Sequence, residues 1–264
     1  MIRRDEANEF LLISQIAHAR LAATLAAAVG NDKFAAPLPR GPVLKAVELH
    51  DEGWPLHDQS PTINARGEPT DVFEMALETA LAIWSASTER AAAADPYAGL
   101  MVSLHGLSLS HRAKPRENGP RSETFALIKF QHAQIEIQET LRGRLGMRLD
   151  LPLLNGLADP GASEEEDLLT ANFRLLEFAD QMSLNLCFRE CRFGTVELGA
   201  SHLRVQTKGS GVFVLEPWPF KDNVLELEIK GKRLGRRKYG TNDDLRAAWS
   251  EAADFTERIG LVRR

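Results

Sequence analysis

The sequence predicts a mainly α-helical fold that ends in a small antiparallel β extension and a terminal helix. Apolar residues recur at intervals of three and four over about the first 190 residues, which is the helical period. After that point, short segments alternate between apolar and polar residues and are separated by Gly or Pro. The 264 residues, 44% apolar and 26% charged, are enough for a large core. We therefore expect a helical domain over residues 1–190 and a small α+β extension over residues 191–264, packed on the helical core.

The first predicted helix spans residues 8–29 and ends at Gly30, because Gly commonly terminates helices. Its inward stripe has helical spacing and contains a histidine among apolar positions: Leu11, Ser14, His18, Leu21 and Leu25. A histidine is therefore expected to face the core of the helical domain.

The second predicted helix spans residues 42–51 and carries His50 and Asp51 in its last turn. It ends there because Gly53 and Pro55 follow directly. Residues 54–70 then form a loop without periodicity, which is long enough to serve as the lid or wall of a site.

Further helices and strands follow from the same periodicities. The helices are expected at residues 70–90, 96–109, 122–145 and 164–188. The last of these has Ser163 as its N-cap, and its inward stripe includes Asp180. The strands are expected at residues 195–198, 202–207, 212–215 and 224–229. A helix over residues 241–258, capped by Thr241, closes the chain.

Composition and charge argue against some classes of partner. A formal net charge of −5, with seven His counted as neutral, gives no basic surface of the kind that nucleic acid binding needs. Six basic residues between Lys230 and Lys238 favour a solvated hairpin edge, with an acidic ligand or nucleic acid as the alternative. No apolar run approaches the roughly 18 residues that span a bilayer, and the first ten residues are too charged for a secretory signal. We therefore expect a cytoplasmic protein without a membrane or nucleic acid partner.

Polar residues at core positions of separate helices are the strongest functional signal. An ionised Asp180 facing an apolar core costs several kcal/mol unless it is paired, hydrogen-bonded or bound to a metal. Together with His18, His50 and Asp51 it supplies two imidazoles and two carboxylates. Such a donor set suits a divalent ion, Mn, Fe, Ni, Zn or Mg, without selecting one. The alternative is a buried hydrogen-bond network without a metal.

Four short motifs occur in a defined order along the chain. They are Ser14-Gln15-x-x-His18, His50-Asp51-x-Gly53-Trp54, Leu104-His105-Gly106 and Asp180-Gln181-x-Ser183-Leu184. In this order they resemble the HD-domain superfamily of metal-dependent phosphohydrolases, and more specifically a bacterial family of uncharacterised proteins with an HD-like helical core. The similarity continues through Pro217-Trp218-Pro219-Phe220 and covers most of the chain. It implies an HD-like helical bundle that holds one divalent ion through His18, His50, Asp51 and Asp180.

The resemblance also implies a reaction, in which the ion lowers the pKa of a water molecule that attacks phosphorus. The substrate would be a phosphate ester such as a nucleotide or another small phosphorylated metabolite. We expect Asp51 and His105 to act at the ion, with His105 as a further ligand or a close neighbour. The loop after the second helix could place His57 or Asp58 over the ion as a general acid.

Two other function classes stay open at this point. One is an HD-like regulatory module that binds a metal or ligand without turnover, because fold alone does not decide function. The other is an iron-dependent site of the oxygenase type, because mixed histidine and carboxylate sites also support oxygen activation. The sequence also leaves the oligomeric state open, a homodimer included.

Overall fold

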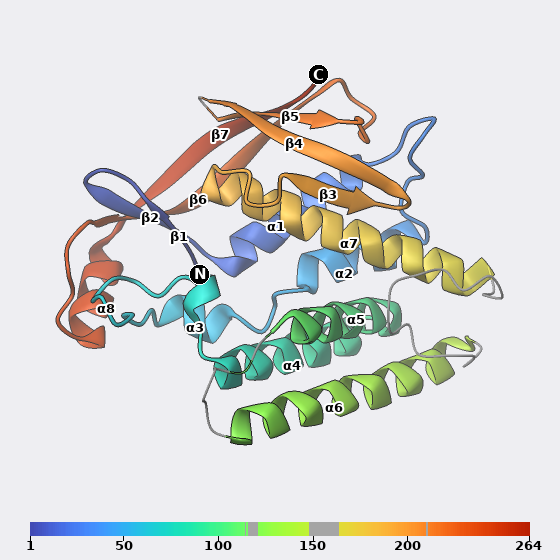
Figure 1. Cartoon of the computed structure of the whole chain (residues 1–264), viewed down its shortest axis with the longest axis horizontal. Helices are drawn as coiled ribbons and strands as arrows, with labels where there is room; N and C mark the ends of the chain where they lie inside the picture. Colours follow the sequence, from blue (N-terminus) through green and yellow to red (C-terminus); the bar gives the residue numbers. More distant parts are fainter. Residues whose placement is uncertain (114, 116–120, 148–163, 210) are drawn as a thin grey trace.

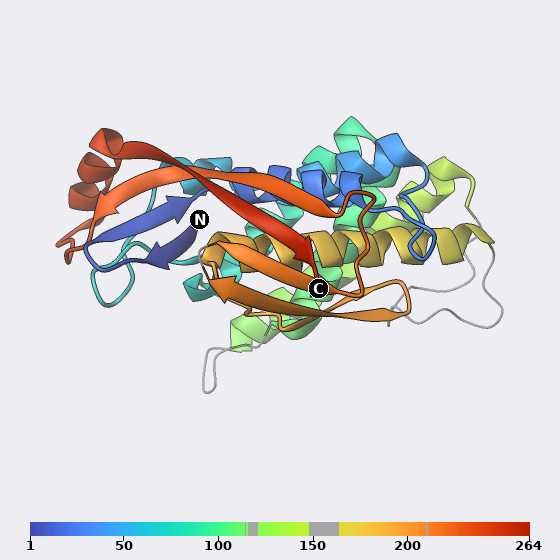
Figure 2. The same ribbon diagram turned by 90° about the horizontal axis from the view of Figure 1, so that it is seen from above.

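Seven strands form one curved sheet that covers the central helices of the molecule (Figures 1 and 2). The computed structural model describes residues 1–113, 115, 121–147, 164–209 and 211–264. The strands are β1 (Ile2–Asp5), β2 (Glu9–Ile13), β3 (Thr195–Leu198), β4 (Ser201–Gly209), β5 (Val212–Glu216), β6 (Val224–Gly235) and β7 (Ala253–Arg263). Their order is β1-β2-β6-β7-β5-β4-β3. All neighbours are antiparallel except β5 and β7, which are parallel.

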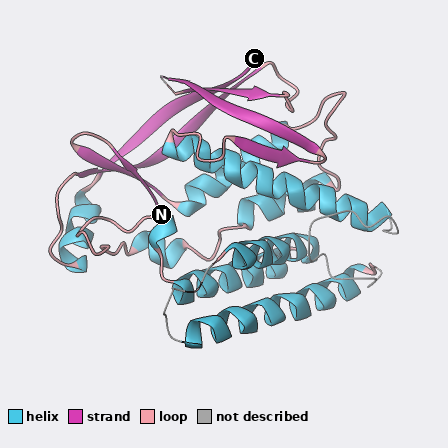
Figure 3. Cartoon of the chain, viewed as in Figure 1, coloured by secondary structure: helices cyan, strands magenta, loops and turns pink. Residues whose placement is uncertain are grey.

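The helices form layers beneath this sheet (Figures 1 and 3). They are α1 (Gln15–Ala28), α2 (Arg40–Leu49), α3 (Pro55–Gln59), η1 (Val72–Glu74), α4 (Leu77–Ala94), α5 (Pro96–Arg112), α6 (Arg121–Leu145), α7 (Glu164–Phe188) and α8 (Asn242–Glu251). Helices α1 and α7 pack against each other and against the sheet, and α2 and α5 follow beneath them. Helices α4 and α6 pack on α5 and complete the lower side. The main core therefore lies between the sheet and the pair α1 and α7.

The predicted fold class, a mainly α-helical bundle with a small C-terminal β extension and a terminal helix, is wrong. The sheet has seven strands in a mixed arrangement, and it takes strands from both ends of the chain. Strands β1 and β2 precede α1, and β2 lies where the prediction has the start of the helix 8–29. The predicted helix 241–258 ends early, because α8 stops at Glu251 and strand β7 takes up its last six residues, 253–258. The division of the chain into two domains at residue 190 stays a prediction.

Burial on both faces explains why β2 resembles part of a helix in the sequence. Leu11 and Ile13 face the main core, whereas Phe10 and Leu12 pack with Leu234 and residues of α8 on the other side. A strand that is buried on both faces is a continuous apolar run and loses the alternation that identifies strands. The run then joins the apolar stripe of the adjacent helix in the sequence, so that no boundary is visible between them.

Other predicted elements are confirmed with shifted ends. The helices that contain His18 and His50 occur as α1 and α2, and the helix over residues 164–188 is α7. The predicted cap Ser163 lies outside the described residues. The four predicted strands between residues 195 and 229 are β3, β4, β5 and β6, and β6 continues to Gly235. The loop predicted over residues 54–70 contains the short helix α3. None of the helices in the described ranges is both long and apolar enough to cross a membrane.

Candidate metal centre

A cluster of buried polar side chains lies where α1, α5 and α7 meet the end of α2. It consists of His18, His50, Asp51, His105 and Asp180, each at most 9% exposed. His18 and Asp180 are separated by 162 positions in the sequence, and their atoms Nε2 and Oδ1 lie 3.0 Å apart. The structure therefore brings together all five residues predicted to bind or flank a metal ion.

The distances in this cluster resemble those of an ion site. His50 Nε2 lies 3.6 Å from both Asp51 Oδ2 and Asp180 Oδ1. His18 Nε2 lies 3.8 Å from Asp51 Oδ2. One donor atom each from His18, His50 and Asp180 can be chosen so that all three lie within 4.8 Å of one another. Such spacing allows three protein ligands to share one cation.

The position of each residue of the cluster follows from the geometry of the helix that carries it. Ser14 caps α1 by accepting a hydrogen bond from the backbone N–H of Ala17, which sets the start of the helix one turn before His18. His50 is the C-cap of α2, so that Asp51 follows where the chain leaves the helix. Asp180 lies in the middle of α7, on the side that packs against α1. The site is thus built from one helix start, one helix end and one helix interior.

Hydrogen bonds set the tautomers of the two histidines. His50 Nδ1 donates to the carbonyl oxygen of Val47 at 2.7 Å, so the neutral ring carries no hydrogen on Nε2. The hydroxyl of Ser183 lies 2.9 Å from the carbonyl oxygen of Asp180 and 2.8 Å from His18 Nδ1, and when it donates to the carbonyl it accepts from Nδ1. Both Nε2 lone pairs consequently face carboxylate oxygens. This pattern is typical of histidines that bind metal ions.

Lone pairs that face one another require a cation between them. His18 Nε2 and Asp180 Oδ1 are both acceptors in the neutral tautomer, and His50 Nε2 is buried without a hydrogen-bond partner. A proton on the imidazole or a metal ion can satisfy these atoms. The mixed nitrogen and oxygen donors fit a divalent ion.

The pKa values of the cluster residues reflect the two carboxylates that lie close to the histidines. Burial lowers the pKa of His50, but the carboxylates of Asp51 and Asp180 outweigh it and raise the pKa to about 9. Burial raises the pKa of Asp51. Burial acts in the same direction on Asp180, but the imidazoles of His18 and His50 hold its pKa well below the usual range. The cluster therefore stabilises positive charge next to Asp180.

His105 differs from the other two histidines. Its Nε2 lies 3.8 Å from the second oxygen of Asp180, and its Nδ1 is buried without a hydrogen-bond partner. Burial lowers the pKa of His105 to about 3, so the ring is neutral at physiological pH. His105 can therefore offer a lone pair to the ion or to a ligand beside it.

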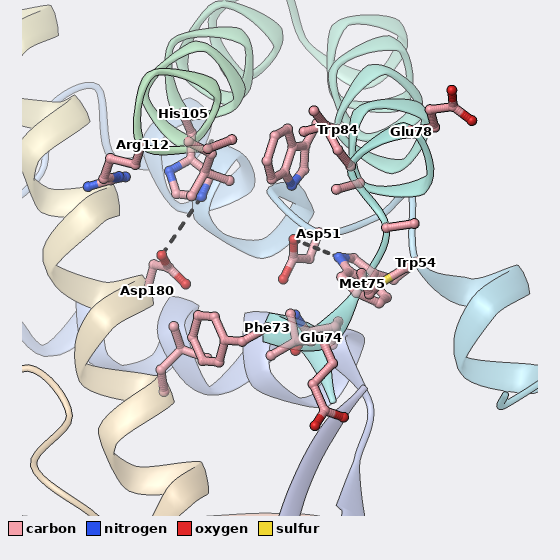
Figure 4. Close-up of a pocket in the computed structure, with 18 of the residues that line it drawn as sticks. Asp51, Trp54, Phe73, Glu74, Met75, Glu78, Trp84, His105, Arg112 and Asp180 are labelled. Atoms are coloured by element: carbon pink, nitrogen blue, oxygen red, sulfur yellow. Dashed lines mark hydrogen bonds and ion pairs between the residues drawn. The ribbon is translucent and has the colours of Figure 1, made fainter. Parts of the chain in front are cut away.

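A cavity of about 770 Å³ opens beside the cluster (Figure 4). Asp51, His105 and Asp180 lie in its wall. The indole Nε1 of Trp54 donates a hydrogen bond to Asp51 Oδ1 at 3.1 Å. This bond fixes the orientation of the carboxylate. The cavity gives a small molecule access to the buried carboxylates.

The other two predicted catalytic residues do not line this cavity. The His57 side chain is exposed, with its ring 6.3 Å from that of Trp54. Asp58 is buried, accepts a hydrogen bond from the backbone N–H of Gln15 and forms an ion pair with the amino group of Met1. A general acid role for His57 or Asp58 stays a prediction.

Several residues of the site were not identified from the sequence. Ser183 belongs to the motif Asp180-Gln181-x-Ser183-Leu184 but has no role in the predicted site, although its spacing of one helical turn from Asp180 could have indicated a contact. Phe73 and Trp84 line the cavity, but neither lies in a motif that distinguishes it from a packing residue. These aromatic side chains are recognisable only once the helices are placed.

The basic residues between Lys230 and Lys238 pair mainly within the chain. Arg233 pairs with Glu9 on the neighbouring strand β2. Arg237 forms a bidentate pair with Asp244 of α8, at 2.7 and 2.9 Å. Arg236 donates to the backbone carbonyl of Glu6 at 2.6 Å. These contacts favour the interpretation of this segment as a charged sheet edge.

Comparisons with known proteins identify a family but no activity. One family model, described as a protein of unknown function (DUF3891), matches residues 1–236. No curated protein and no solved structure matches the chain. The similarity to HD-domain proteins therefore stays a prediction. Because the matched region includes every residue of the buried cluster and most of the sheet, the chain belongs to the DUF3891 family.

Proposed function

We propose that the buried cluster binds a divalent metal ion and that the protein hydrolyses a phosphate ester at this ion. The observation that carries the proposal is the orientation of His18 and His50. Both rings use Nδ1 for a hydrogen bond and direct the Nε2 lone pair toward the carboxylate of Asp180. In a buried site, lone pairs that face one another need a proton or a metal ion between them, and the mixed nitrogen and oxygen donors fit a divalent ion.

The residues around the cluster have separate tasks in this proposal. When bound, a divalent ion supplies Lewis acidity and makes hydroxide available at neutral pH. His18, His50, Asp51 and Asp180 would hold the ion, and Trp54 keeps Asp51 in place through its indole N–H. The neutral ring of His105 lies at the cavity wall, where Nε2, 3.8 Å from Asp180 Oδ2, can bind a hydrogen of a water or product molecule.

Metal analysis of the purified protein tests the first half of the proposal. Protein prepared without chelator should contain a divalent metal, and His50→Ala and Asp180→Asn should each lose it. His132→Ala is the matched control, because this histidine is exposed on α6 away from the cluster. Stoichiometric metal that survives both substitutions would contradict the site.

Turnover of a panel of phosphate esters tests the second half, with Mn²⁺, Mg²⁺, Ni²⁺ or Fe²⁺ added to the protein. Release of inorganic phosphate that depends on His50 and Asp180 supports the proposed hydrolase. Bound metal without any turnover would instead favour a regulatory module that binds a ligand. Bound iron with oxygen consumption would favour an oxygenase.

A further inference from the structure

The walls of the cavity beside the metal cluster are mainly apolar and aromatic. Trp54 and Met75 lie next to each other beside Asp51, Trp84 and Phe73 lie on opposite sides of the space, and Leu109 and Leu184 contribute aliphatic surface. Figure 4 shows the side chains of Trp54, Phe73, Met75 and Trp84 around the space in front of Asp51 and Asp180. A ligand that reaches the carboxylates must therefore lie against aromatic surface.

Contacts behind the cavity hold the aromatic walls in place. The ring of Phe73 stacks on Phe188 of α7 at 5.8 Å, and Arg192 covers the ring of Phe188 at 3.6 Å. The indole of Trp84 packs against Phe130 of α6 at 6.0 Å. Because these rings are already fixed, a bound ligand does not have to order them, which favours binding.

The charges of the cavity do not suit a polyphosphate. Among the described lining residues, Arg112 is the only Lys or Arg, and its guanidinium forms an ion pair with Glu177 at 3.1 Å. The carboxylates of Glu74 and Glu78 point away from the space between Asp51 and Asp180 (Figure 4). Several phosphate groups usually require several basic side chains or a nest of backbone N–H groups. One phosphate group facing a metal ion has no such requirement.

Gln15 supplies one polar contact in this apolar environment. Its side chain lines the cavity, is only 3% exposed and has an amide oxygen without a hydrogen-bond partner among the described residues. An unpartnered buried amide is costly unless a ligand or water pairs with it. The Gln15 amide is therefore placed to bind a polar atom of a ligand that otherwise contacts aromatic surface.

We infer that the substrate is a phosphate monoester of an aromatic alcohol, bound with its ring against Phe73 and Trp84 and with a polar atom at Gln15. This inference rests on the proposed hydrolysis at the metal cluster. In the reaction, water adds to phosphorus, the bond from phosphorus to the aryl oxygen breaks, and that oxygen leaves as the alcohol after taking a proton. Inorganic phosphate is the second product.

The test compares 1-naphthyl phosphate with glycerol 3-phosphate and adenosine triphosphate on the metal-loaded protein. Binding is measured by calorimetry and hydrolysis by phosphate release. We expect 1-naphthyl phosphate to bind about tenfold or more tightly than either of the others, and kcat/KM to follow the same order. Phe73→Ala and Gln15→Ala should each weaken its binding by about five- to tenfold. Phe125→Ala is the matched control, because Phe125 is also exposed and lies outside the cavity.

The outcomes separate this inference from the proposed function. If the protein hydrolyses glycerol 3-phosphate or adenosine triphosphate as well as 1-naphthyl phosphate, the inference is wrong and the hydrolase proposal stands. If 1-naphthyl phosphate binds tightly but no ester is hydrolysed, the hydrolase proposal fails, and the preference of the cavity for an aromatic ligand stands. Unchanged binding in both Phe73→Ala and Gln15→Ala would overturn the inferred binding mode.

Discussion

The orientation of His50 depends on a property of helix ends. The last carbonyl groups of a helix have no helical N–H partner, and Val47 is in the last turn of α2. His50 uses this carbonyl to hold its own ring, with Nδ1 as the donor. The end of α2 thus contributes both a proposed ligand and the group that orients it. At His18 the hydroxyl of Ser183 serves the same purpose from α7.

Ser183 should therefore matter for metal affinity even though it does not lie among the proposed ligands. In Ser183→Ala, His18 Nδ1 loses its acceptor, and the ring is free to turn or to change its tautomer. We expect the metal affinity to fall by roughly 10- to 100-fold, measured by competition with a chelating dye. Ser110→Ala is the control, because this buried serine bonds only to a carbonyl of its own helix among the contacts described. Equal affinities in both variants would argue against a supporting role for Ser183.

The charge of Glu74 should make stability depend on pH. Burial opposes ionisation of Glu74, but hydrogen bonds from Asn64, the backbone N–H of Asp71 and Arg66 outweigh it and lower its pKa to about 2. Because this folded value lies below the ordinary glutamate pKa of 4.5, the stabilisation is complete above about pH 4.5 and is lost as the pH falls toward 2. Glu74→Gln should therefore be less stable than the wild type at pH 7, by about 1 kcal/mol.

Urea unfolding at several pH values checks this prediction. The difference in free energy of unfolding between the wild type and Glu74→Gln should shrink between pH 4.5 and 2. Glu89→Gln, at an exposed position of α4, provides the comparison. A difference that stays constant over this range would show that the charge of Glu74 does not stabilise the fold.

At the scale of elements, the helices that carry the site could be predicted, but part of the sheet could not. His18 and Asp180 stand within apolar stripes of helical period, so their inward direction is visible in the sequence. Strand β2 is hidden because it is buried on both faces. Strand β7 does alternate between buried and more exposed residues, with Phe255, Ile259 and Leu261 buried. Only one residue separates it from the capped helix α8, so the two elements look continuous in the sequence. Local periodicity cannot place such a boundary, because pairing with β6 and β5 decides it.

The turn after His50 and Asp51 depends on a close approach between two elements. A Cβ atom on Gly53 would collide with the carbonyl oxygen of Ile83 and lie 2.9 Å from Ser87 Oγ, both on α4. The backbone N–H of Gly53 also donates to Ser87 Oγ at 2.9 Å. The contact with α4 therefore fixes where the chain turns away from the metal cluster.

Gly53→Ala should consequently destabilise the protein and displace Asp51. We expect a loss of about 1 to 3 kcal/mol in the free energy of unfolding, together with weaker metal binding. Gly41→Ala is the control, because nothing lies within 4 Å of a Cβ atom at this position of α2, where Ala is the better helix former. The prediction is wrong if thermal and urea unfolding place both variants at or above the stability of the wild type.

At the scale of the whole molecule, the sheet and the site depend on the same two helices. Helices α1 and α7 pack on each other and carry the sheet, and they also supply His18 and Asp180. Residues from α2 and α5 complete the cluster, so that four separate helices meet there. The residues of the buried cluster could be predicted from the order of the motifs along the sequence. The cavity and its aromatic walls could not, because they form only when these helices pack together.

Removal of the metal should therefore lower the stability of the entire fold. In the unfolded chain the ligands are far apart, so the ion stabilises the native state by about 2.7 kcal/mol at a free concentration 100 times its Kd. For a chain of this size that corresponds to a fall in Tm of roughly 5 to 10 °C when excess chelator is added. Differential scanning calorimetry with and without chelator measures the shift. Asp180→Asn should show a small shift or none, because it has already lost the ion. A chelator-dependent shift of the same size in Asp180→Asn would mean that the stabilising ion binds elsewhere in the chain.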